Sequence, residues 1–210
     1  MSALDPPQKG AAVGGSSIRL AGGLTGSLGC LVSLDGVRMI LSSAHILTTD
    51  GAGSPGEKVH LNGATTIGEF SEIGETLNFG GQNTLDVALA KVTAASVSPW
   101  IGKWGPPTVT PGQVSAGMRV WIWGAASGRM RAHVTDLAWS GVVTYGHRAS
   151  HFSGLVQCEA YGQSGDSGAA VLDDDMNLVG VHVGGGTAGG VFCPIDAILA
   201  RWPTLTIIGK

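Results

Sequence analysis

The apolar positions of the chain fall in short runs that recur roughly every 8 to 15 residues and end at glycine or polar turns. Runs of this length and spacing predict β-strands rather than helices. The runs at 29–34 and 37–41 flank Asp35-Gly36, a dipeptide that favours a two-residue hairpin turn. Further strands are predicted over residues 86–92, 114–123, 133–143, 155–160, 169–172, 178–183 and 190–193.

Helical spacing of apolar positions is convincing only over residues 195–202, which follow Pro194 and precede Pro203. The pattern therefore predicts an all-β protein with one short C-terminal helix. Residues 1–15 are rich in Pro, Gly and Ala and predict a flexible lead-in. Residues 99–111 hold four of the nine prolines and no strand pattern, so we interpret them as a connector between two halves, 16–98 and 112–210.

The composition narrows the classes of function. Apolar residues make up 43% of the 210 residues and charged residues 13%, which is enough to bury a large core. The net charge is −3, and Lys and Arg form no basic stripe, so we expect no nucleic-acid partner. No apolar run approaches the roughly 20 residues that a membrane helix needs, so we expect no membrane partner either.

The cysteines and the first residues suggest a compartment. Cys30, Cys158 and Cys193 are three in number, which is not the dense, even set of a disulfide-stabilised secreted domain. The N-terminal residues show no basic region followed by an apolar one, as a secretory signal would. We therefore expect a cytoplasmic protein with reduced thiols.

The most informative segment is Gly162-Gln163-Ser164-Gly165-Asp166-Ser167-Gly168. A serine between glycines in a tight turn exposes its hydroxyl to an incoming carbonyl group. The same turn can aim the backbone N–H groups of Gly165 and Ser167 at one point, as an oxyanion hole requires. The alternative is an ordinary glycine-rich turn.

Two other segments offer partners for that serine. Small residues precede His45 in Ser42-Ser43-Ala44-His45, which lets an imidazole turn into a cleft and act as a base near neutral pH. Asp86 begins an apolar strand, where a buried carboxylate would need a partner such as that imidazole. Taken alone, His45 can also be a structural histidine and Asp86 a turn residue.

Together the three segments resemble the chymotrypsin-like serine peptidases, which share the order His, Asp, Ser. Ser42-Ser43-Ala44-His45 resembles the family's Thr-Ala-Ala-His, Asp86-Val87-Ala88-Leu89 resembles Asp-Ile-Ala-Leu, and Gly165-Asp166-Ser167-Gly168 is identical to its nucleophile motif. The resemblance covers roughly residues 16–202. It implies two perpendicular six-stranded β-barrels with a catalytic triad of His45, Asp86 and Ser167 in the cleft between them.

The chain departs from the secreted members of that family at two places. Ile46 stands where they carry a cysteine, and the resemblance assigns Cys30 to the position of that cysteine's partner. Ala12-Val13-Gly14-Gly15 only faintly resembles the processed Ile-Val-Gly-Gly terminus whose ammonium group pairs with the residue at Asp166. With no such terminus, Asp166 needs another partner, which the sequence does not name.

Specificity follows from the residues that the resemblance assigns to the substrate pocket: Tyr161, Ser164, His182, Gly184, Gly185 and Gly190. Tyr161 replaces the acidic residue of trypsins, so cleavage after Lys or Arg is not supported. Gly180-Val181-His182-Val183-Gly184-Gly185 resembles the pocket strand of glutamyl endopeptidases and picornavirus-type proteases, which implies cleavage after Glu or Gln. The alternative is a core histidine bonded to Tyr161 or to a backbone carbonyl.

The leading hypothesis is a serine endopeptidase acting on an intracellular protein or peptide, with a regulatory protein as a candidate second partner and with no cofactor and no metal. The alternatives are a non-catalytic protein-binding domain on the same fold and a protease that processes only its own polyprotein. His147 and His151 lack a third zinc ligand nearby, and Asp173-Asp174-Asp175 is typical of a solvated turn.

Overall fold

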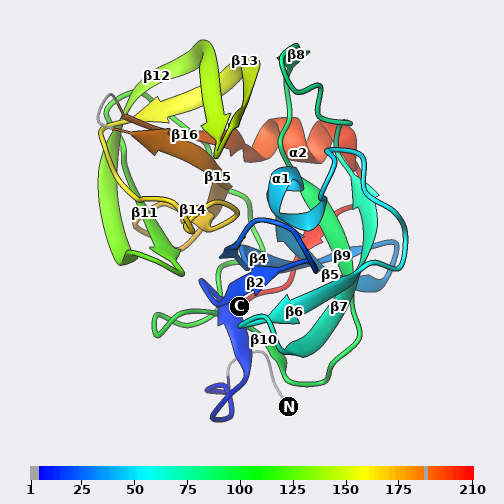
Figure 1. Ribbon diagram of the computed structural model, residues 1–210. Coiled ribbons are helices and arrows are strands. Elements are labelled where there is room, and N and C mark those ends of the chain that lie inside the picture. The colour runs from blue at the N-terminus through cyan, green and yellow to red at the C-terminus, as the bar shows by residue number, and fades with distance from the viewer. Residues whose placement is uncertain (1–4, 187–188) are drawn as a thin grey trace.

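The computed structural model describes residues 5–186 and 189–210, which fold into two barrel-like β-sheets and two short helices (Figure 1). The predicted all-β fold with two barrels and a short C-terminal helix is confirmed. The helix, α2, spans Ile195–Arg201, close to the predicted 195–202.

The N-terminal barrel lies at the right of Figure 1. Its sheet has the order β17-β4-β5-β9-β7-β6-β2-β3, and neighbouring strands are antiparallel. Hydrogen bonds from Gly15 N–H to Leu28 O and from Leu28 N–H to Ser16 O extend the pairing of β2 with β3 beyond the two strands. The strands are β2 (Ser17–Arg19), β3 (Gly26–Ser27), β4 (Cys30–Leu34), β5 (Val37–Ser42), β6 (Lys58–Leu61), β7 (Thr65–Ile73), β9 (Ala88–Val92) and β17 (Thr206–Ile207).

The C-terminal barrel lies at the left of Figure 1 and closes on itself. Its sheet has the order β12-β11-β14-β15-β16-β13-β8, and a further pairing of β12 with β13 joins six of these strands into a ring. The strands are β8 (Gln82–Asn83), β11 (Arg119–Gly124), β12 (Gly128–Tyr145), β13 (Arg148–Cys158), β14 (Ala170–Leu172), β15 (Leu178–Gly186) and β16 (Gly189–Pro194).

The hairpin predicted at Asp35-Gly36 joins β4 to β5. Both residues have positive φ, 50° and 80°, as a type I′ turn requires at its two central positions. Such a turn matches the right-handed twist of the flanking strands, so Leu34 pairs directly with Val37 and Ser42 is carried to the base of the cleft. Ser42 is followed by Ser43 and then by the single helical turn α1 (Ala44–Leu47), which the sequence pattern did not predict.

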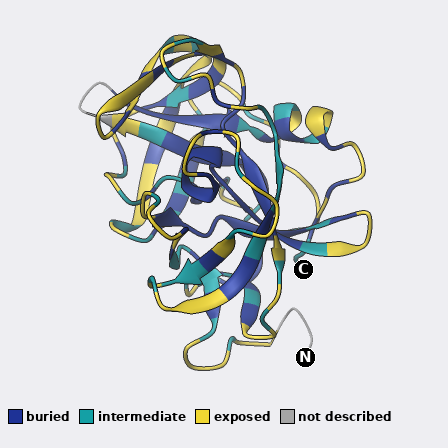
Figure 2. Ribbon diagram, turned by 45° about the vertical axis from the view of Figure 1, so that its right-hand side comes forward, coloured by how far each residue is buried: buried dark blue, intermediate teal, exposed yellow. Residues whose placement is uncertain are grey.

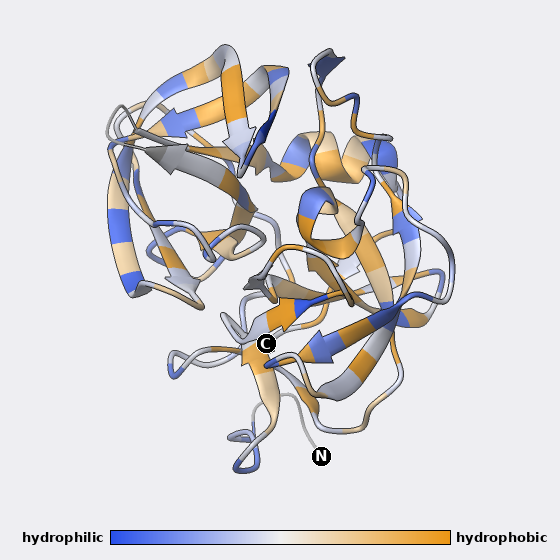
Figure 3. Ribbon diagram, viewed as in Figure 1, coloured by the Kyte–Doolittle hydropathy of each residue, from blue (hydrophilic) through white to orange (hydrophobic). Residues whose placement is uncertain are grey.

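Most buried apolar residues lie on the strands of the two barrels, and Figures 2 and 3 colour the ribbon by burial and by hydropathy. One core cluster fills the N-terminal barrel and extends between the barrels, where it includes Val143, Tyr145 and Phe152. A second, smaller cluster around Ile122, Val171 and Phe192 fills the C-terminal barrel. The junction between the halves is thus a continuous apolar core, which gives the residues at the cleft a rigid base.

The predicted lead-in and connector meet in a small sheet. Within residues 1–15 lies β1 (Ala12–Gly14), which pairs in parallel with β10 (Val97–Ile101) at the start of the predicted connector. Close packing explains the small residues of β1, because a Cβ at Gly14 would lie 2.5 Å from the Gly29 carbonyl oxygen. The sequence does not indicate a strand at residues 12–14, because three residues are too few for an alternation of apolar and polar positions to be recognised.

A hairpin of the C-terminal barrel is attached to the N-terminal half. Strand β13 pairs in parallel with β8, which lies on the segment leading to Asp86. Gly80 N–H donates to Ala149 O at 2.7 Å, and the buried Asn83 side chain donates to His151 O at 3.2 Å. The tip of the β12–β13 hairpin is therefore held against the opposite half of the molecule.

Cys30, Cys158 and Cys193 are all free and buried. Burial raises the pKa of both the Cys30 and the Cys158 thiol to about 12. The expectation that Cys30 faces the position after His45 is wrong: Cys30 pairs with Leu41, and a Cβ at Gly26 would lie 2.5 Å from Ile46 Cγ1. Neither Ile46 nor the residue opposite it can therefore form a disulfide.

In the described part of the chain no helix is both long and apolar enough to cross a membrane.

The burial of three separate thiols predicts that no disulfide contributes to stability. Thiol titration of the denatured, unreduced protein should find three free groups, and reducing agent should leave the melting temperature unchanged, because no cross-link restricts the unfolded chain. Finding one thiol would contradict this prediction and would point to one disulfide.

Candidate active site

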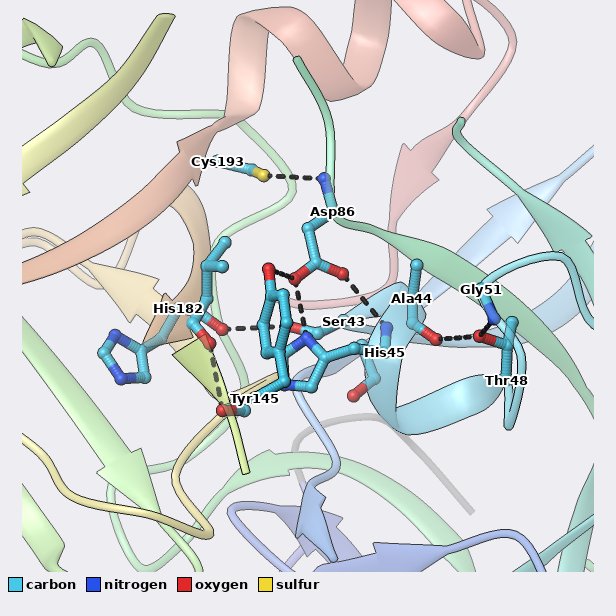
Figure 4. A network of polar contacts seen from close by, with 12 residues as sticks. Ser43, Ala44, His45, Thr48, Gly51, Asp86, Tyr145, His182 and Cys193 are labelled. Carbon is cyan, nitrogen blue, oxygen red and sulfur yellow. Dashed lines mark hydrogen bonds and ion pairs between the residues drawn. The ribbon is translucent and has the colours of Figure 1, made fainter. Parts of the chain in front are cut away.

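His45 and Asp86 form a buried pair at the junction of the barrels. The Asp86 carboxylate is fully buried, and one of its oxygens accepts a hydrogen bond of 2.6 Å from His45 Nδ1 (Figure 4). Its other oxygen accepts the backbone N–H of His45 at 3.0 Å. A carboxylate has no proton to give, so this geometry leaves Nε2 of a neutral His45 ring as a proton acceptor.

The small residues before His45 connect it to the C-terminal barrel. Ser43 Oγ donates to the His182 carbonyl at 2.9 Å, and Ser42 Oγ donates to the Ser27 carbonyl at 2.8 Å. Both serines are fully buried, so these bonds satisfy hydroxyl groups that water cannot reach. They fix the single turn of α1 on which the imidazole is mounted.

Two further contacts on Asp86 were not predicted from the sequence. Tyr145 donates its hydroxyl to Asp86 Oδ2 at 2.8 Å, and its ring lies against the His45 ring with centroids 4.2 Å apart. The backbone N–H of Asp86 donates to Cys193 Sγ at 3.2 Å. Tyr145 begins a segment that reads as a loop, and Cys193 lies on an apolar strand, so neither carries a local signal of this role.

Ser167 lies across the same cavity from His45. Both residues line a cavity of about 430 Å³, together with Gly165, Ser164 and His182. The Ser167 hydroxyl donates to the Val183 carbonyl at 2.9 Å. Transfer of its proton to His45 therefore requires rotation about the Cα–Cβ bond, which is common where substrate is needed to align such a pair.

The turn before Ser167 presents two unused backbone donors. Among the described residues no acceptor contacts the N–H of Gly165 or that of Ser167, whereas Asp166 N–H donates to Gln163 O and Gly168 N–H donates to His182 O. Gly165 has φ +103°, a conformation that residues with a side chain rarely adopt. Gly165 and Ser167 both line the cavity, and an oxyanion requires two free donors.

Asp166 has the partner that the sequence left open. Its carboxylate is fully buried and accepts three backbone N–H groups, those of Ala126 at 2.9 Å, Ser127 at 3.0 Å and Gln163 at 2.8 Å. The segment that resembles a processed terminus lies elsewhere, because Ala12 on β1 pairs with Val97 on β10 and its N–H donates to the carbonyl of the preceding Ser96. Among the described residues, these backbone N–H groups are the donors that compensate the negative charge of the Asp166 carboxylate.

The residues assigned to the substrate pocket separate into two layers. Ser164, His182, Gly184 and Gly185 line the cavity. Tyr161 lies behind His182, with its hydroxyl 3.2 Å from His182 Nδ1, and a Cβ at Gly190 would lie 2.4 Å from the Tyr161 ring. The pocket residues Tyr161 and Gly190 thus support His182 and do not line the cavity themselves.

His182 is buried and neutral. Burial lowers its pKa to about 4, and the positive charge of His45 when protonated acts in the same direction, while Asp166 acts to raise it. A Cβ at Gly162 would lie 3.3 Å from His182 Nε2, and His182 itself lines the cavity. Burial also raises the pKa of Tyr161 well above its usual value, so its hydroxyl stays protonated.

Within residues 5–186 and 189–210, no three His, Cys, Asp or Glu side chains are grouped as a metal site requires. His147 and His151 are both exposed on the β12–β13 hairpin. Asp174 of the acidic turn forms an ion pair with Arg119 and accepts Trp121 Nε1–H.

Comparison with known proteins identifies the fold. Residues 26–181 match the family model of the trypsin-like peptidase domain. A glutamic-acid-specific serine protease that uses a histidine triad in substrate binding superposes with a TM-score of 0.70, at 19% identity over 94% of this chain and 100% of that one. Among curated protein sequences, none is detectably similar.

Two bacterial proteases are similar in structure to the same extent. Thermobifida fusca protease A has a TM-score of 0.69 at 22% identity, over 95% of this chain and 100% of its own. Cellulomonas bogoriensis chymotrypsin has a TM-score of 0.65 at 22% identity, over 95% of this chain and 99% of its own. At these identities the likeness establishes the two-barrel architecture.

The three backbone donors on Asp166 predict the effect of Asp166→Asn. The amide NH₂ would face at least one backbone N–H, so we expect a loss of about 1–3 kcal/mol in the free energy of unfolding, measured by urea titration. The exposed Asp175→Asn is the matched control and should change stability by less than about 0.5 kcal/mol. Equal stability of the two variants would contradict this role of Asp166.

Proposed function

This chain belongs to the trypsin-like peptidase family, and on that basis we propose that it is a serine endopeptidase whose nucleophile is Ser167, whose base is His45 and whose orienting carboxylate is Asp86. The observation that carries the proposal is the facing arrangement of Ser167 and the His45–Asp86 pair across one cavity. The N-terminal half, 16–98, contributes His45 and Asp86, and the C-terminal half, 112–210, contributes Ser167.

The proposed reaction uses only groups of this chain and water. Ser167 Oγ bonds to the carbonyl carbon of the substrate as its proton passes to His45 Nε2, and the N–H groups of Gly165 and Ser167 receive the oxyanion. His45 then gives the proton to the leaving amine nitrogen, the C–N bond breaks and an acyl-enzyme remains. Water attacks the acyl carbon as His45 takes its proton, and the ester bond to Ser167 Oγ then breaks, so that the carboxylic acid product leaves and the proton returns from His45 to Oγ.

Asp86 orients His45 in each of these steps. Its bond to Nδ1 keeps the proton of neutral His45 on that nitrogen, and its charge stabilises the imidazolium that forms. Each oxyanion donor is worth about 2.7–4 kcal/mol of transition-state stabilisation in enzymes of known mechanism. The two unused N–H groups support this mechanism over a non-catalytic binding domain, which has no need of them.

Removal of the Ser167 hydroxyl tests this proposal. Ser167→Ala should lower kcat by a factor on the order of 10⁶ with an unchanged melting temperature, and His45→Ala should cost nearly as much, because the residues act as a unit. The loss of activity is measured by hydrolysis of denatured casein and by labelling with a fluorophosphonate probe. Ser115→Ala, which changes an exposed serine outside the cavity, is the control that should retain labelling.

Equal turnover by the wild-type protein and Ser167→Ala would refute the assignment of the nucleophile.

For specificity, we propose that His182 binds the side chain before the scissile bond and favours Gln, with Glu second. Tyr161 supports this, because a hydroxyl that donates to Nδ1 leaves the single N–H of the neutral ring on Nε2, next to the cavity. A neutral donor suits an amide oxygen. A substrate carboxylate would instead face the buried Asp166, which lies on the far side of Gly162.

This proposal predicts a pH-dependent preference. At pH 7.5 we expect kcat/KM for a Gln peptide to exceed that for the matching Glu peptide about tenfold, a difference of about 1.4 kcal/mol. The ratio should hold down to about pH 5 and fall below it, because burial lowers the pKa of His182 to about 4 and protonation of His182 or of the substrate Glu carboxyl then removes the disadvantage of Glu.

His182→Ala should abolish the preference and reduce cleavage after Gln about 3- to 10-fold, the worth of one neutral hydrogen bond. Consistent cleavage after Leu, Phe or Arg that His182→Ala leaves unaffected would refute this role for His182.

A further inference from the structure

Among the described residues, one group outside the three proposed catalytic residues donates a hydrogen bond to the Asp86 carboxylate, and it is the hydroxyl of Tyr145. We propose that Tyr145 is a positioning residue for catalysis, whose hydroxyl holds the Asp86 carboxylate in the orientation that directs His45. The inference rests on the proposed function, since it assigns Tyr145 a part in the same reaction.

The Tyr145 hydroxyl contacts the same Asp86 oxygen as His45 Nδ1. Asp86 Oδ2 accepts both His45 Nδ1–H, at 2.6 Å, and the Tyr145 hydroxyl, at 2.8 Å, while Oδ1 accepts the His45 backbone N–H (Figure 4). The carboxylate is fully buried, so its charge depends on protein donors. Of the described side chains, only those of His45 and Tyr145 donate to it.

The neighbouring strands provide no replacement for this hydroxyl. Val183 on β15 contributes an apolar side chain, and its carbonyl is engaged by Ser167. Cys193 on β16 accepts the Asp86 backbone N–H through its sulfur. Burial and the charge of Asp86 raise the pKa of Tyr145, so its hydroxyl remains a donor across the whole working range of pH.

Tyr145 is held in place by the N-terminal half of the molecule, although it belongs to the C-terminal barrel. It ends β12, and the hairpin tip after it is fixed by the β8–β13 pairing and by Arg148 Nη1–H donating to Thr49 O at 3.1 Å. Phe79 packs edge-on against its ring, with centroids 6.2 Å apart. The hydroxyl is thus fixed on Asp86 before any substrate binds.

Removal of the hydroxyl should change both the rate and its dependence on pH. Without it, the Asp86 charge is compensated by His45 alone and holds the His45 proton more tightly, so the acid limb of the rate moves to higher pH. The other titratable groups facing the pair are His182 across the cavity, Cys193 behind Asp86, and Glu75, which accepts the N–H of Leu85. None of them donates to the Asp86 carboxylate.

The test compares Tyr145→Phe with Phe79→Leu. Tyr145→Phe removes a single oxygen and keeps the ring on His45. We expect kcat to fall about tenfold and KM to change less than about twofold. The acid limb of the pH profile of kcat/KM should move to higher pH by about half a unit. Phe79→Leu loosens the packing of the same ring but keeps the hydroxyl, so its pH profile should match that of the wild type.

Labelling by a fluorophosphonate probe across pH gives the same comparison without a peptide substrate. A Tyr145→Phe protein with wild-type rate and wild-type pH profile overturns the inference, while loss of labelling in Ser167→Ala shows that the proposed function stands. Labelling that persists in Ser167→Ala overturns the proposed function instead. A Phe79→Leu profile shifted like that of Tyr145→Phe would assign the effect to packing and also overturn the inference.

A measurement on the unmutated site covers the case in which Tyr145→Phe fails to fold. The chain has two tyrosines, so incorporation of 3-fluorotyrosine gives two ¹⁹F resonances, which Tyr161→Phe assigns. The Tyr145 resonance should shift with pH through the acid limb of activity, and in His45→Ala this shift should vanish. A Tyr145 resonance that stays constant through the acid limb overturns the inference.

Discussion

The Asp86 carboxylate is buried at the junction of two β-barrels, where water cannot compensate its charge. Three donors do so instead, two from His45 and one from Tyr145, and they come from opposite halves of the chain. Much of the surrounding architecture maintains this arrangement. The turn of α1 is bonded to β15 through Ser43, and the β12–β13 hairpin is bonded to the segment that leads into Asp86.

A second buried carboxylate, Asp166, organises the nucleophile turn in a comparable way. Its oxygens accept backbone N–H groups from the 124–128 turn and from Gln163, which draws the two segments together behind Gly165. Ser27 reinforces the same contact, because its hydroxyl donates to Gly165 O and accepts Ala125 N–H, both at 2.9 Å. With the neighbouring donors engaged, the N–H groups of Gly165 and Ser167 stay free to face the cavity.

Local pattern was sufficient to predict much of the fold. Asp35-Gly36 specifies its hairpin through the backbone conformations that it tolerates, and the C-terminal helix was located by its flanking prolines and its apolar spacing. The nucleophile turn, His45 and Asp86 were identifiable because each motif is local in sequence and the order of the three is characteristic. The structure brings these residues together around one cavity, although their roles in catalysis stay predictions.

What the sequence did not reveal depends on contacts between distant segments. Tyr145 resembles any tyrosine before a glycine turn, and its bond to Asp86 exists only because β13 pairs with β8 in the other half. Cys30 was assigned to the wrong position, since counting along the strand cannot show that Gly26, rather than Cys30, approaches Ile46. The two layers of the pocket are equally non-local, because Tyr161 and Gly190 meet behind His182 only in the closed barrel.

The return of the last strand to the first barrel has a consequence for folding. Strand β17 pairs with β4, so Ile207 lies opposite Val32, which stands 175 residues earlier in the chain (207 − 32). Contacts of such large sequence separation carry a high loop-closure entropy and are characteristic of slowly folding β-proteins. The sheet of the N-terminal barrel is therefore completed only by the C-terminal segment, and separation of the halves after a proteolytic nick would leave β4 and β17 with unpaired edges prone to aggregation.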